Sequence, residues 1–291
     1  MQTNESAIAL DSYISQLTAF LKAKGIQAAC KQISDQGAQL EICGQNVPVE
    51  TRDGGAEIVY SSLSASLARE LMQFEPVLNI AYVQPPLIGS DESGKGDLFG
   101  ALCVASCYCG QKEYSALSKM GIKDSKLLTD KAMLGFEQRI KSLCETEAAI
   151  LEPARYNASY KAEPNMSILL GKLHARAIDG LIASTGCETV LVDKFSPSNR
   201  VVPYIKSAGA NISEFPKAEK NIAVAAASIL ARCEFLRSID RISEEFGLRI
   251  PLGAGKQADE AAKRIYEERG YEGLYMCAKV NFSNISKAIS Q

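Results

Sequence analysis

The stretch that decides the fold runs from Leu87 to Cys107 and reads LIGSDESGKGDLFGALCVASC. It opens with a short apolar run, carries the adjacent acids Asp91 and Glu92 among glycines, and ends in small and β-branched residues typical of a strand. Two interpretations compete for it. Residues 89–95 match most of the phosphate-binding loop Gly-x-x-x-x-Gly-Lys-Ser/Thr, whereas the two acids indicate a metal site.

The phosphate-loop interpretation fails at three points. Gly96 stands where that loop needs the hydroxyl of a serine or threonine. Asp91 and Glu92 would lie inside the loop and repel the phosphate that its N–H groups should hold. The residues from Asp97 onward predict a strand, where a phosphate loop would be followed by a helix. We therefore reject a nucleotide-binding loop.

Four carboxylates fall at the ends of predicted elements. Asp91 and Glu92 follow one apolar run, Asp193 ends the run TVLVD (189–193), and Glu219 stands where an alanine-rich helix is expected to begin. In α/β sheets such ends lie along one edge, so we expect these side chains to converge. Ligands that are all oxygen suit Mg²⁺ or Mn²⁺, and two such ions can clamp the attacking and leaving oxygens of a phosphodiester displacement.

Each acid also has an ordinary structural explanation. The two adjacent acids could be a turn acid and a surface acid, and Asp193 could pair with Lys194 or Arg200. Glu219 could simply be an acid favoured by the N-terminus of a helix. Asp97 is expected to be a structural acid of the turn. The single histidine, at position 174, has helical spacing from its apolar neighbours and is expected to be structural.

The bulk composition is that of an ordinary globular protein, with 46% hydrophobic and 23% charged residues among 291. There is no signal-peptide pattern and no apolar run near ~18 residues, so we expect a cytoplasmic protein without membrane segments. Nine cysteines without a CxxC pair, and one histidine, indicate reduced thiols and argue against a zinc site. A net charge of −2 excludes a strongly basic nucleic-acid binder, so any such binding must use local patches.

Two domains are predicted. Residues 1–76 indicate a small α+β domain, with a helix at 7–24, strands at 27–34, 38–44 and 56–62 separated by turns that include 44–55, and a helix at 63–75. Residues 77–84 form a linker, and residues 85–291 predict an α/β domain with a mixed β-sheet. The elements expected there are strands at 82–90, 98–109, 111–118, 148–153 and 189–195, and helices at 129–146, 165–184, 219–239 and 257–269.

Four motifs in order resemble those of the type 2 ribonucleases H. DESGKG (91–96) is similar to the family's Asp-Glu-x-Gly-(Arg/Lys)-Gly, and IKDSKLL (122–128) resembles its Asp-Ser-Lys segment. VLVDKF (190–195) resembles the strand that bears the third acid, and AVAAASILAR (223–232) the helix that follows the fourth. The segment 156–178, together with Lys95 and Glu219, resembles the ribonuclease HIII branch in particular.

This resemblance implies a ribonuclease H-like mixed β-sheet flanked by helices, preceded by an N-terminal domain similar to half of the TATA-binding protein. It implies an endoribonuclease that hydrolyses the RNA strand of RNA–DNA hybrids and leaves 5′-phosphate and 3′-hydroxyl ends. Asp91, Glu92, Asp193 and Glu219 would be its catalytic acids and would hold two Mg²⁺ or Mn²⁺ ions. The substrate-binding residues implied by the motifs are Ser93, Gly94, Lys95, Gly96, Lys123, Ser125 and Lys126.

Other functions stay open at this point. A ribonuclease HII-like enzyme would incise at single ribonucleotides embedded in DNA, a resolvase-like nuclease would cut DNA, and a non-catalytic protein would only bind nucleic acid. The resemblance also implies that the N-terminal domain binds the hybrid, yet residues 1–85 carry five Lys/Arg against nine Asp/Glu. We therefore expect its contacts to rely on polar groups such as Gln27, Lys31, Gln45 and Asn46. We expect the protein to be a monomer.

Overall fold

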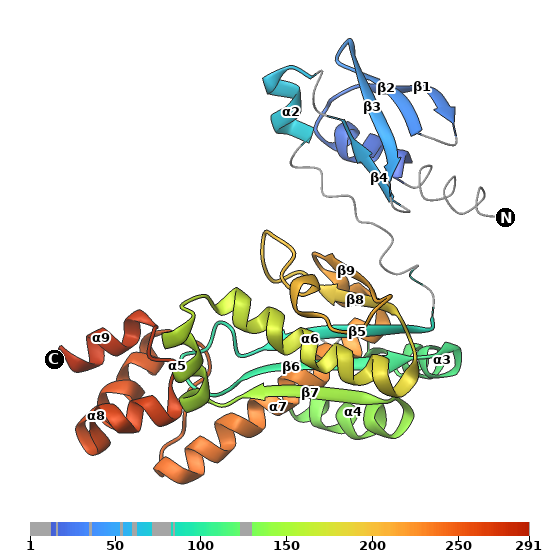
Figure 1. The fold of residues 1–291 in the computed structure, drawn as a ribbon. Helices are drawn as coiled ribbons and strands as arrows, with labels where there is room; N and C mark the ends of the chain where they lie inside the picture. Colours follow the sequence, from blue (N-terminus) through green and yellow to red (C-terminus); the bar gives the residue numbers. More distant parts are fainter. Residues whose placement is uncertain are drawn as a thin grey trace. The chain divides into compact units, whose positions relative to one another are not determined.

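The computed structural model describes residues 13–15, 17–34, 37–52, 55–59, 63–71, 83, 85–122 and 130–290. The chain divides into two compact units, Met1–Asn79 and Ile80–Gln291 (Figure 1). The first has one hydrophobic core cluster and the second has two. The division falls within the segment 77–84 that we expected to be a linker, of which the structure describes only residue 83.

The first unit is a four-stranded antiparallel sheet with helices packed against it. The strand order is β1 (Ala28–Ser34), β2 (Gly37–Ile42), β3 (Gln45–Arg52) and β4 (Gly55–Ile58), and helix α2 spans Ala65–Leu71. Alternate strand residues point to a core that also includes Leu17 and Leu21 from the helical residues 17–23. The predicted α+β arrangement of helix, antiparallel sheet and helix is therefore confirmed.

Strand β3 corrects the turn that we expected at 44–55. Val47 and Val49 are buried and alternate with polar residues, which is the pattern of a strand with one face on the core. Pro48 lies between them, and because proline is typical of turns the segment was not predicted as a strand. The Pro48 carbonyl accepts the Val59 N–H, so its missing N–H falls on the side of the short strand β4 and leaves the pairing with β2 intact.

The second unit contains a five-stranded mixed sheet in the order β7-β6-β5-β8-β9. The central strand β5 (Leu87–Ser93) pairs antiparallel with β6 (Leu102–Cys109) and parallel with β8 (Thr189–Asp193). Strands β7 (Thr146–Leu151) and β9 (Asn211–Phe215) form the edges. The predicted α/β domain with a mixed sheet is confirmed.

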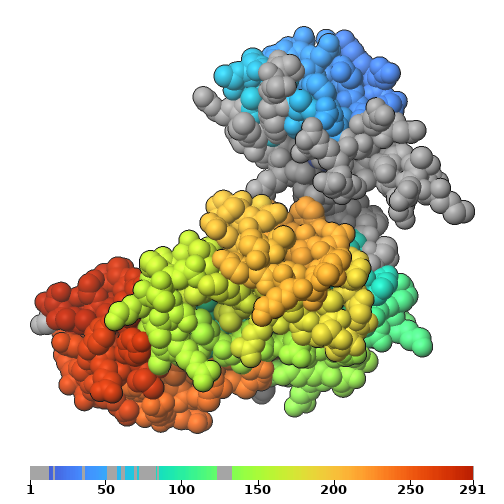
Figure 2. Space-filling model, viewed as in Figure 1, coloured from blue at the N-terminus to red at the C-terminus, as the bar shows by residue number. Residues whose placement is uncertain are grey.

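Two long helices cover the two faces of this sheet. Helix α6 (Met166–Thr185) packs on the face that presents Ile88, Leu102 and Val104, and α7 (Ile222–Phe246) packs on the opposite face. Figure 2 shows that later segments of the chain largely cover the central strands on the side in view. The other helical segments are α3 (Gln111–Lys119), α4 (Asp130–Leu143), α5 (Pro153–Ala162), α8 (Lys256–Cys277), α9 (Ser283–Ile289) and the short 3₁₀ turns η3 (Val202–Tyr204) and η4 (Ala218–Lys220).

Several short elements differ from the expectation. Residues 111–118, expected as a strand, form α3, in which Tyr114 and Leu117 have the helical spacing of three residues. Helices α5 and α9 and strand β9 were not expected, because segments of five to ten residues show too few repeats of either period. Within the described part of the chain, no helix has the length and apolar character needed to cross a membrane.

Helix α7 lies unusually close to strand β5. A Cβ atom added at Gly89 would lie 2.2 Å from the backbone carbonyl carbon of Ala223 and 2.3 Å from the nitrogen of Val224. Real Cβ atoms do not approach backbone that closely, so only glycine allows this packing. The first two turns of α7, up to Ala227, consist of small or short apolar side chains that are fully or almost fully buried.

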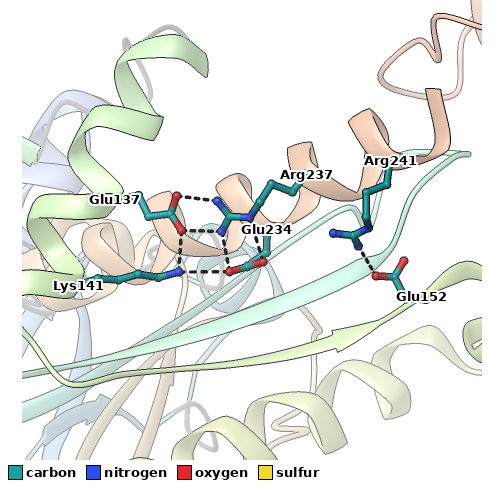
Figure 3. A network of polar contacts seen from close by, with 6 residues as sticks. All are labelled: Glu137, Lys141, Glu152, Glu234, Arg237 and Arg241. Carbon is teal, nitrogen blue, oxygen red and sulfur yellow. Dashed lines mark hydrogen bonds and ion pairs between the residues drawn. The ribbon is translucent and has the colours of Figure 1, made fainter. Parts of the chain in front are cut away.

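A network of ion pairs joins α4 to α7 (Figure 3). Arg237 donates from Nη1 to Glu137 Oε2 at 2.7 Å and from Nη2 to Glu137 Oε1 at 2.5 Å, which is a bidentate pair. Lys141 lies 2.8 Å from Glu137 Oε1, and Glu234 accepts from Arg237 at 2.7 Å. The hydrogen bonds from Arg237 first, and then Lys141, lower the pKa of Glu137 from 4.5 to about 2.

Replacing Glu137 with glutamine should lower the free energy of unfolding by about 1–2 kcal/mol at pH 7, because Arg237 and Lys141 lose their shared carboxylate. Because the pKa of Glu137 is lowered, its carboxylate stabilises the fold fully above pH 4.5, and this stabilisation is lost as the pH falls toward 2. Urea unfolding at several pH values should therefore show the difference from wild type shrinking over that interval. The matched control is Glu152→Gln, whose pair with Arg241 is about half exposed and should contribute less than ~0.5 kcal/mol. If the loss of unfolding free energy in Glu137→Gln stays constant with pH, the pKa of Glu137 is not lowered by this network.

Candidate active site

The parallel strands β5 and β8 bring two acids side by side. Ser90 is opposite Val192 in this pair, so the next residues along each strand, Asp91 and Asp193, are neighbours at the sheet edge. Strand β5 continues to Ser93, so Asp91 lies on a strand and not in the glycine-rich turn that the sequence suggested. Asp91 is buried, with 7% of its surface exposed.

The four predicted acids are linked at this edge through the interactions of Asp91 and Asp193 with their neighbours. Burial, followed by the charges of Glu92 and Asp193, raises the pKa of Asp91 well above its ordinary value. Burial also raises the pKa of Asp193 to about 6, with further contributions from the charges of Glu219 and Glu92. Like charges in a poorly hydrated place disfavour ionisation, so both shifts have the same physical origin. The structure thus brings together the four carboxylates that the sequence singled out.

Hydrogen bonds from the backbone orient two of these acids. The Glu92 N–H donates to Asp91 Oδ1, and the Ala218 N–H donates to Asp193 Oδ1, each at 2.7 Å. Ala218 begins the 3₁₀ turn η4, and the next residue is Glu219. Glu219 therefore lies in a turn just before α7 and not in the first turn of that helix, as one alternative assumed.

The other structural explanation for Asp193 is also not supported. Within the part of the chain that the structure describes, neither Lys194 nor Arg200 forms an ion pair with it. The backbone N–H of Lys194 donates to the Phe215 carbonyl and that of Arg200 to Glu214 Oε2, while Arg200 Nε is buried without a hydrogen-bond partner in the described part of the chain. The charge on Asp193 is consequently faced by other acids, which is typical of a cation site and unusual for a structural residue.

His174 contacts the site, although we expected it to be a structural side chain. Its Nε2 atom lies 3.4 Å from Glu92 Oε2, and its Nδ1 atom lies 2.8 Å from Ser90 Oγ. The ring is fully buried and stacks on Phe195, with ring centroids 4.9 Å apart and planes 3° from parallel. No pattern in the sequence indicates this contact, because α6 and β5 meet only in the folded chain.

The donor set fits a divalent cation. Among the described residues, three buried side-chain atoms have no hydrogen-bond partner, and two of them, Glu92 Oε2 and His174 Nε2, lie at this site. An unsatisfied buried carboxylate oxygen is costly, and it lies beside acids whose pKa values are raised by mutual repulsion. A cation held by Asp91, Glu92, Asp193 and Glu219 would satisfy that oxygen and offset the repulsion. Carboxylate oxygens are the ligands that Mg²⁺ and Mn²⁺ prefer.

Two glycines of the loop after these acids differ in their surroundings: Gly94 has no room for a side chain, and Gly96 has. Gly94 has a φ of +88°, and a Cβ atom there would lie 2.2 Å from the Ala101 carbonyl oxygen, so the fold requires glycine. Gly96 is exposed, and a Cβ atom at this position would meet no other atom within 4 Å. Lys95 donates from Nζ to the Phe195 carbonyl at 2.5 Å, and Ser93 is partly buried at the end of β5.

The remaining predicted substrate-binding residues, Lys123, Ser125 and Lys126, lie outside the described residues.

A buried lysine braces the far side of this loop. Lys279 is fully buried and donates from Nζ to the carbonyls of Asp97, Phe99 and Gly100 at 3.0, 3.3 and 2.8 Å. Burial lowers its pKa to about 8. The Asp97 carboxylate accepts the Gly253 N–H at 2.6 Å, so Asp97 is the structural acid that we expected. Segments distant in sequence therefore fix the conformation of the loop.

Comparison with protein families gives a match to the family described as Ribonuclease HII, over residues 88–285. Among curated proteins, the chain is 37% identical over 208 residues to the ribonuclease HIII of Protochlamydia amoebophila, covering 71% of this chain and 69% of that protein. It is 39% identical over 207 residues to the ribonuclease HIII of Chlamydia felis, covering 69% of each.

Two solved structures resemble nearly the whole chain. The crystal structure of Bst-RNase HIII in complex with Mn²⁺ has a TM-score of 0.69 and 27% identity, covering 94% of this chain and 96% of its own. The ribonuclease H3 of Aquifex aeolicus has a TM-score of 0.59 and 26% identity, covering 94% and 97%. The expected ribonuclease H-like sheet flanked by helices is thereby confirmed.

We predict that His174 positions Glu92 for metal binding. His174→Asn keeps a nitrogen near Ser90 and removes the one facing Glu92, so the Mn²⁺ affinity should fall about 10-fold or more. His174→Gln retains a nitrogen that reaches toward Glu92 and should recover part of that loss. The measurement is the rise in melting temperature with Mn²⁺ concentration. If both variants bind Mn²⁺ like the wild type and differ only in metal-free melting temperature, the histidine serves packing alone.

Proposed function

The chain belongs to the ribonuclease HII family and is a ribonuclease H, and we propose that Asp91, Glu92, Asp193 and Glu219 carry out its cleavage of RNA–DNA hybrids. The observation that carries this proposal is the convergence of the four carboxylates at the shared edge of β5 and β8. The enzyme hydrolyses the RNA strand within the hybrid, and the proposed products carry 5′-phosphate and 3′-hydroxyl ends.

The enzyme uses divalent metal, and the proposed complement is two ions of Mg²⁺ or Mn²⁺ held by the four acids. When bound, the ions supply Lewis-acid stabilisation to the attacking and leaving oxygens of the phosphodiester. Asp91 would be a ligand of this complement, since it lies beside Asp193 at the sheet edge and next to Glu92 in sequence. The backbone N–H of Ala218 and the buried ring of His174 keep Asp193 and Glu92 aimed at the same place.

The glycine-rich loop is proposed to meet the RNA strand. Gly96 is exposed and leaves room for a sugar–phosphate backbone to approach the chain closely. Recognition of ribose there would rest on the 2′-hydroxyl, the group that distinguishes RNA from DNA. Ser93 and Gly94 would contribute through their backbone, and Lys95 would have to exchange its bond to Phe195 for a phosphate.

The proposed phosphate contacts outside this loop, Lys123, Ser125 and Lys126, rest on the resemblance of their segment to the Asp-Ser-Lys motif.

We also propose that the enzyme acts as a monomer in the cytoplasm. A single chain supplies all four acids, so no second copy is needed to complete the site. None of the nine cysteines, all within the described residues, forms a disulfide, and seven of them are buried, as expected in a reducing compartment.

Asp91→Asn tests the site directly. The substitution is nearly isosteric, so the protein should fold, while cleavage of a labelled RNA–DNA duplex should fall by several orders of magnitude. Because one repelling charge is gone, the metal-free variant should melt no lower than wild type, and Mn²⁺ should stabilise it less. Asp240→Asn, an exposed change on α7, is the control and should retain full activity. Substantial cleavage by Asp91→Asn means that the assignment of the site is wrong.

The same assay separates the alternative functions. A duplex with one embedded ribonucleotide should be a poor substrate, and efficient incision there would indicate ribonuclease HII-like activity. Cutting of duplex DNA would indicate a resolvase-like nuclease. Binding without cleavage of any substrate in Mg²⁺ or Mn²⁺ would indicate a non-catalytic protein.

The N-terminal unit is proposed to bind the hybrid. Support comes from the solved relatives, whose similarity extends over 94% of the chain. Of the polar groups that we expected to make contacts, Lys31 pairs with Glu41, and Gln45 exchanges two hydrogen bonds of 2.9 Å with Ser64 at the start of α2. The side chains of Gln27 and Asn46 are exposed and are the better placed of the four to meet a ligand.

Deleting residues 1–79 should weaken hybrid binding about 10-fold or more, because the second of two linked contacts is lost. Metal-dependent cleavage at saturating hybrid should persist, since the four acids and their supports lie in the second unit. Fluorescence anisotropy with a labelled hybrid in metal-free buffer gives the affinity. An unchanged affinity in the truncated protein refutes a binding role for the N-terminal unit.

A further inference from the structure

Three buried thiols meet in the second unit, apart from the four acids. Cys107 and Cys109 lie near the end of β6, and Cys144 directly follows α4. Their sulfur atoms all lie within 4.8 Å of one another, and the Sγ atoms of Cys107 and Cys109 are 3.9 Å apart. In sequence these residues form no CxxC pair, which is why we did not expect a metal-binding cluster of cysteines.

Regular backbone structure holds each of the three sulfurs in place. Cys107 and Cys109 are two residues apart on β6, so their side chains share one face of the sheet. The Cys144 N–H donates to the Ile140 carbonyl at 2.8 Å, and the next residue, Glu145, accepts the Tyr108 N–H at 2.9 Å. Hydrogen bonds on both sides of Cys144 therefore fix it opposite the strand, and the cluster is formed in advance of any ligand.

The spacing of the sulfurs suits a tetrahedral soft metal ion. Zn²⁺ binds thiolates at about 2.3 Å, which places the sulfur atoms of one site about 3.8 Å apart. The pair on β6 already has 3.9 Å between its sulfurs. An ion could thus enter among the three sulfurs with little movement of the strand.

The charges around the cluster also favour a cation. The cluster lies at the C-terminal end of α4, where the helix dipole is negative. Glu113, in the first turn of α3, adds a negative charge beside Gly110. Both features would stabilise a bound divalent cation.

We propose that Cys107, Cys109 and Cys144 form a structural zinc site, with the Glu113 carboxylate as the candidate fourth ligand. Glu113 folds back over the residue that follows Cys109, since a Cβ at Gly110 would lie 2.6 Å from Glu113 Oε2. Binding releases the protons of the three thiols and forms three Zn–S bonds. The ion joins the end of α4 to β6, on the side of the sheet where α7 packs.

The competing explanation is that these cysteines merely fill the core as small apolar side chains. The chain provides a matched comparison, because Cys233 in α7 is also fully buried and lies outside the cluster. Replacing a cysteine that only packs with alanine should leave the bound metal unchanged. Replacing a metal ligand with alanine should reduce the bound metal.

The first test measures metal in the full-length protein, purified with a phosphine reductant and without chelator. We expect about one tightly held Zn²⁺ per chain, with sulfur neighbours at about 2.3 Å in X-ray absorption at the zinc edge. Zinc with only oxygen neighbours would be adventitious ion at the four acids, and that result overturns the proposal. Protein that contains no zinc and takes up none after refolding with Zn²⁺ overturns it as well.

The second test uses Co²⁺, whose thiolate complexes absorb by charge transfer in the near ultraviolet, whereas its carboxylate complexes do not. Wild type, Asp91→Asn and Cys233→Ala should show this band after refolding with Co²⁺, and Cys144→Ala should lose most of it. A band that survives in Cys144→Ala contradicts the proposal. If Cys144→Ala does not fold, the X-ray absorption of the wild-type protein decides the question alone.

Discussion

The direct contact between the backbone of α7 and strand β5 is the constraint on which the site depends. Gly89 allows it, because any Cβ at this position would overlap the backbone at Ala223. With the helix seated on the strand, the Ser228 hydroxyl reaches Asp91 by a hydrogen bond. The turn that precedes the helix brings Glu219 next to Asp193. Acids from three separate segments consequently share one edge of the sheet.

This arrangement costs stability, which other parts of the unit must offset. Burying several carboxylates together raises the pKa values of Asp91 and Asp193, so their charged forms destabilise the metal-free fold. The offset comes from the two hydrophobic cores on either side of the sheet and from the Glu137–Arg237 pair that joins α4 to α7. The cluster of four acids thus rests on a scaffold stabilised by contacts that do not involve it.

What could be predicted from the sequence follows from the range of each interaction. Asp91, Glu92 and Asp193 were found because they follow or end apolar runs, and Glu219 was located from the alanine-rich segment after it. Strand β3 was missed because Pro48 has the chemistry of a turn, and β9 because five residues show too little alternation. The contact of His174 with Glu92 and the approach of Cys144 to β6 join elements that are distant in sequence. No local pattern in the sequence predicts such contacts, because they form only when α6 packs on the sheet and α4 packs against α7.

The buried Lys279 makes the loop beside the acids dependent on a distant part of the chain. Its ammonium group holds the three carbonyls of the loop beside the acids, and the neighbouring Ala278 pairs with Phe99. Residues 179 to 182 positions apart in the sequence are joined by these hydrogen bonds. The shape of the loop beside the acids therefore depends on the C-terminal part of the chain, which contributes none of the four acids.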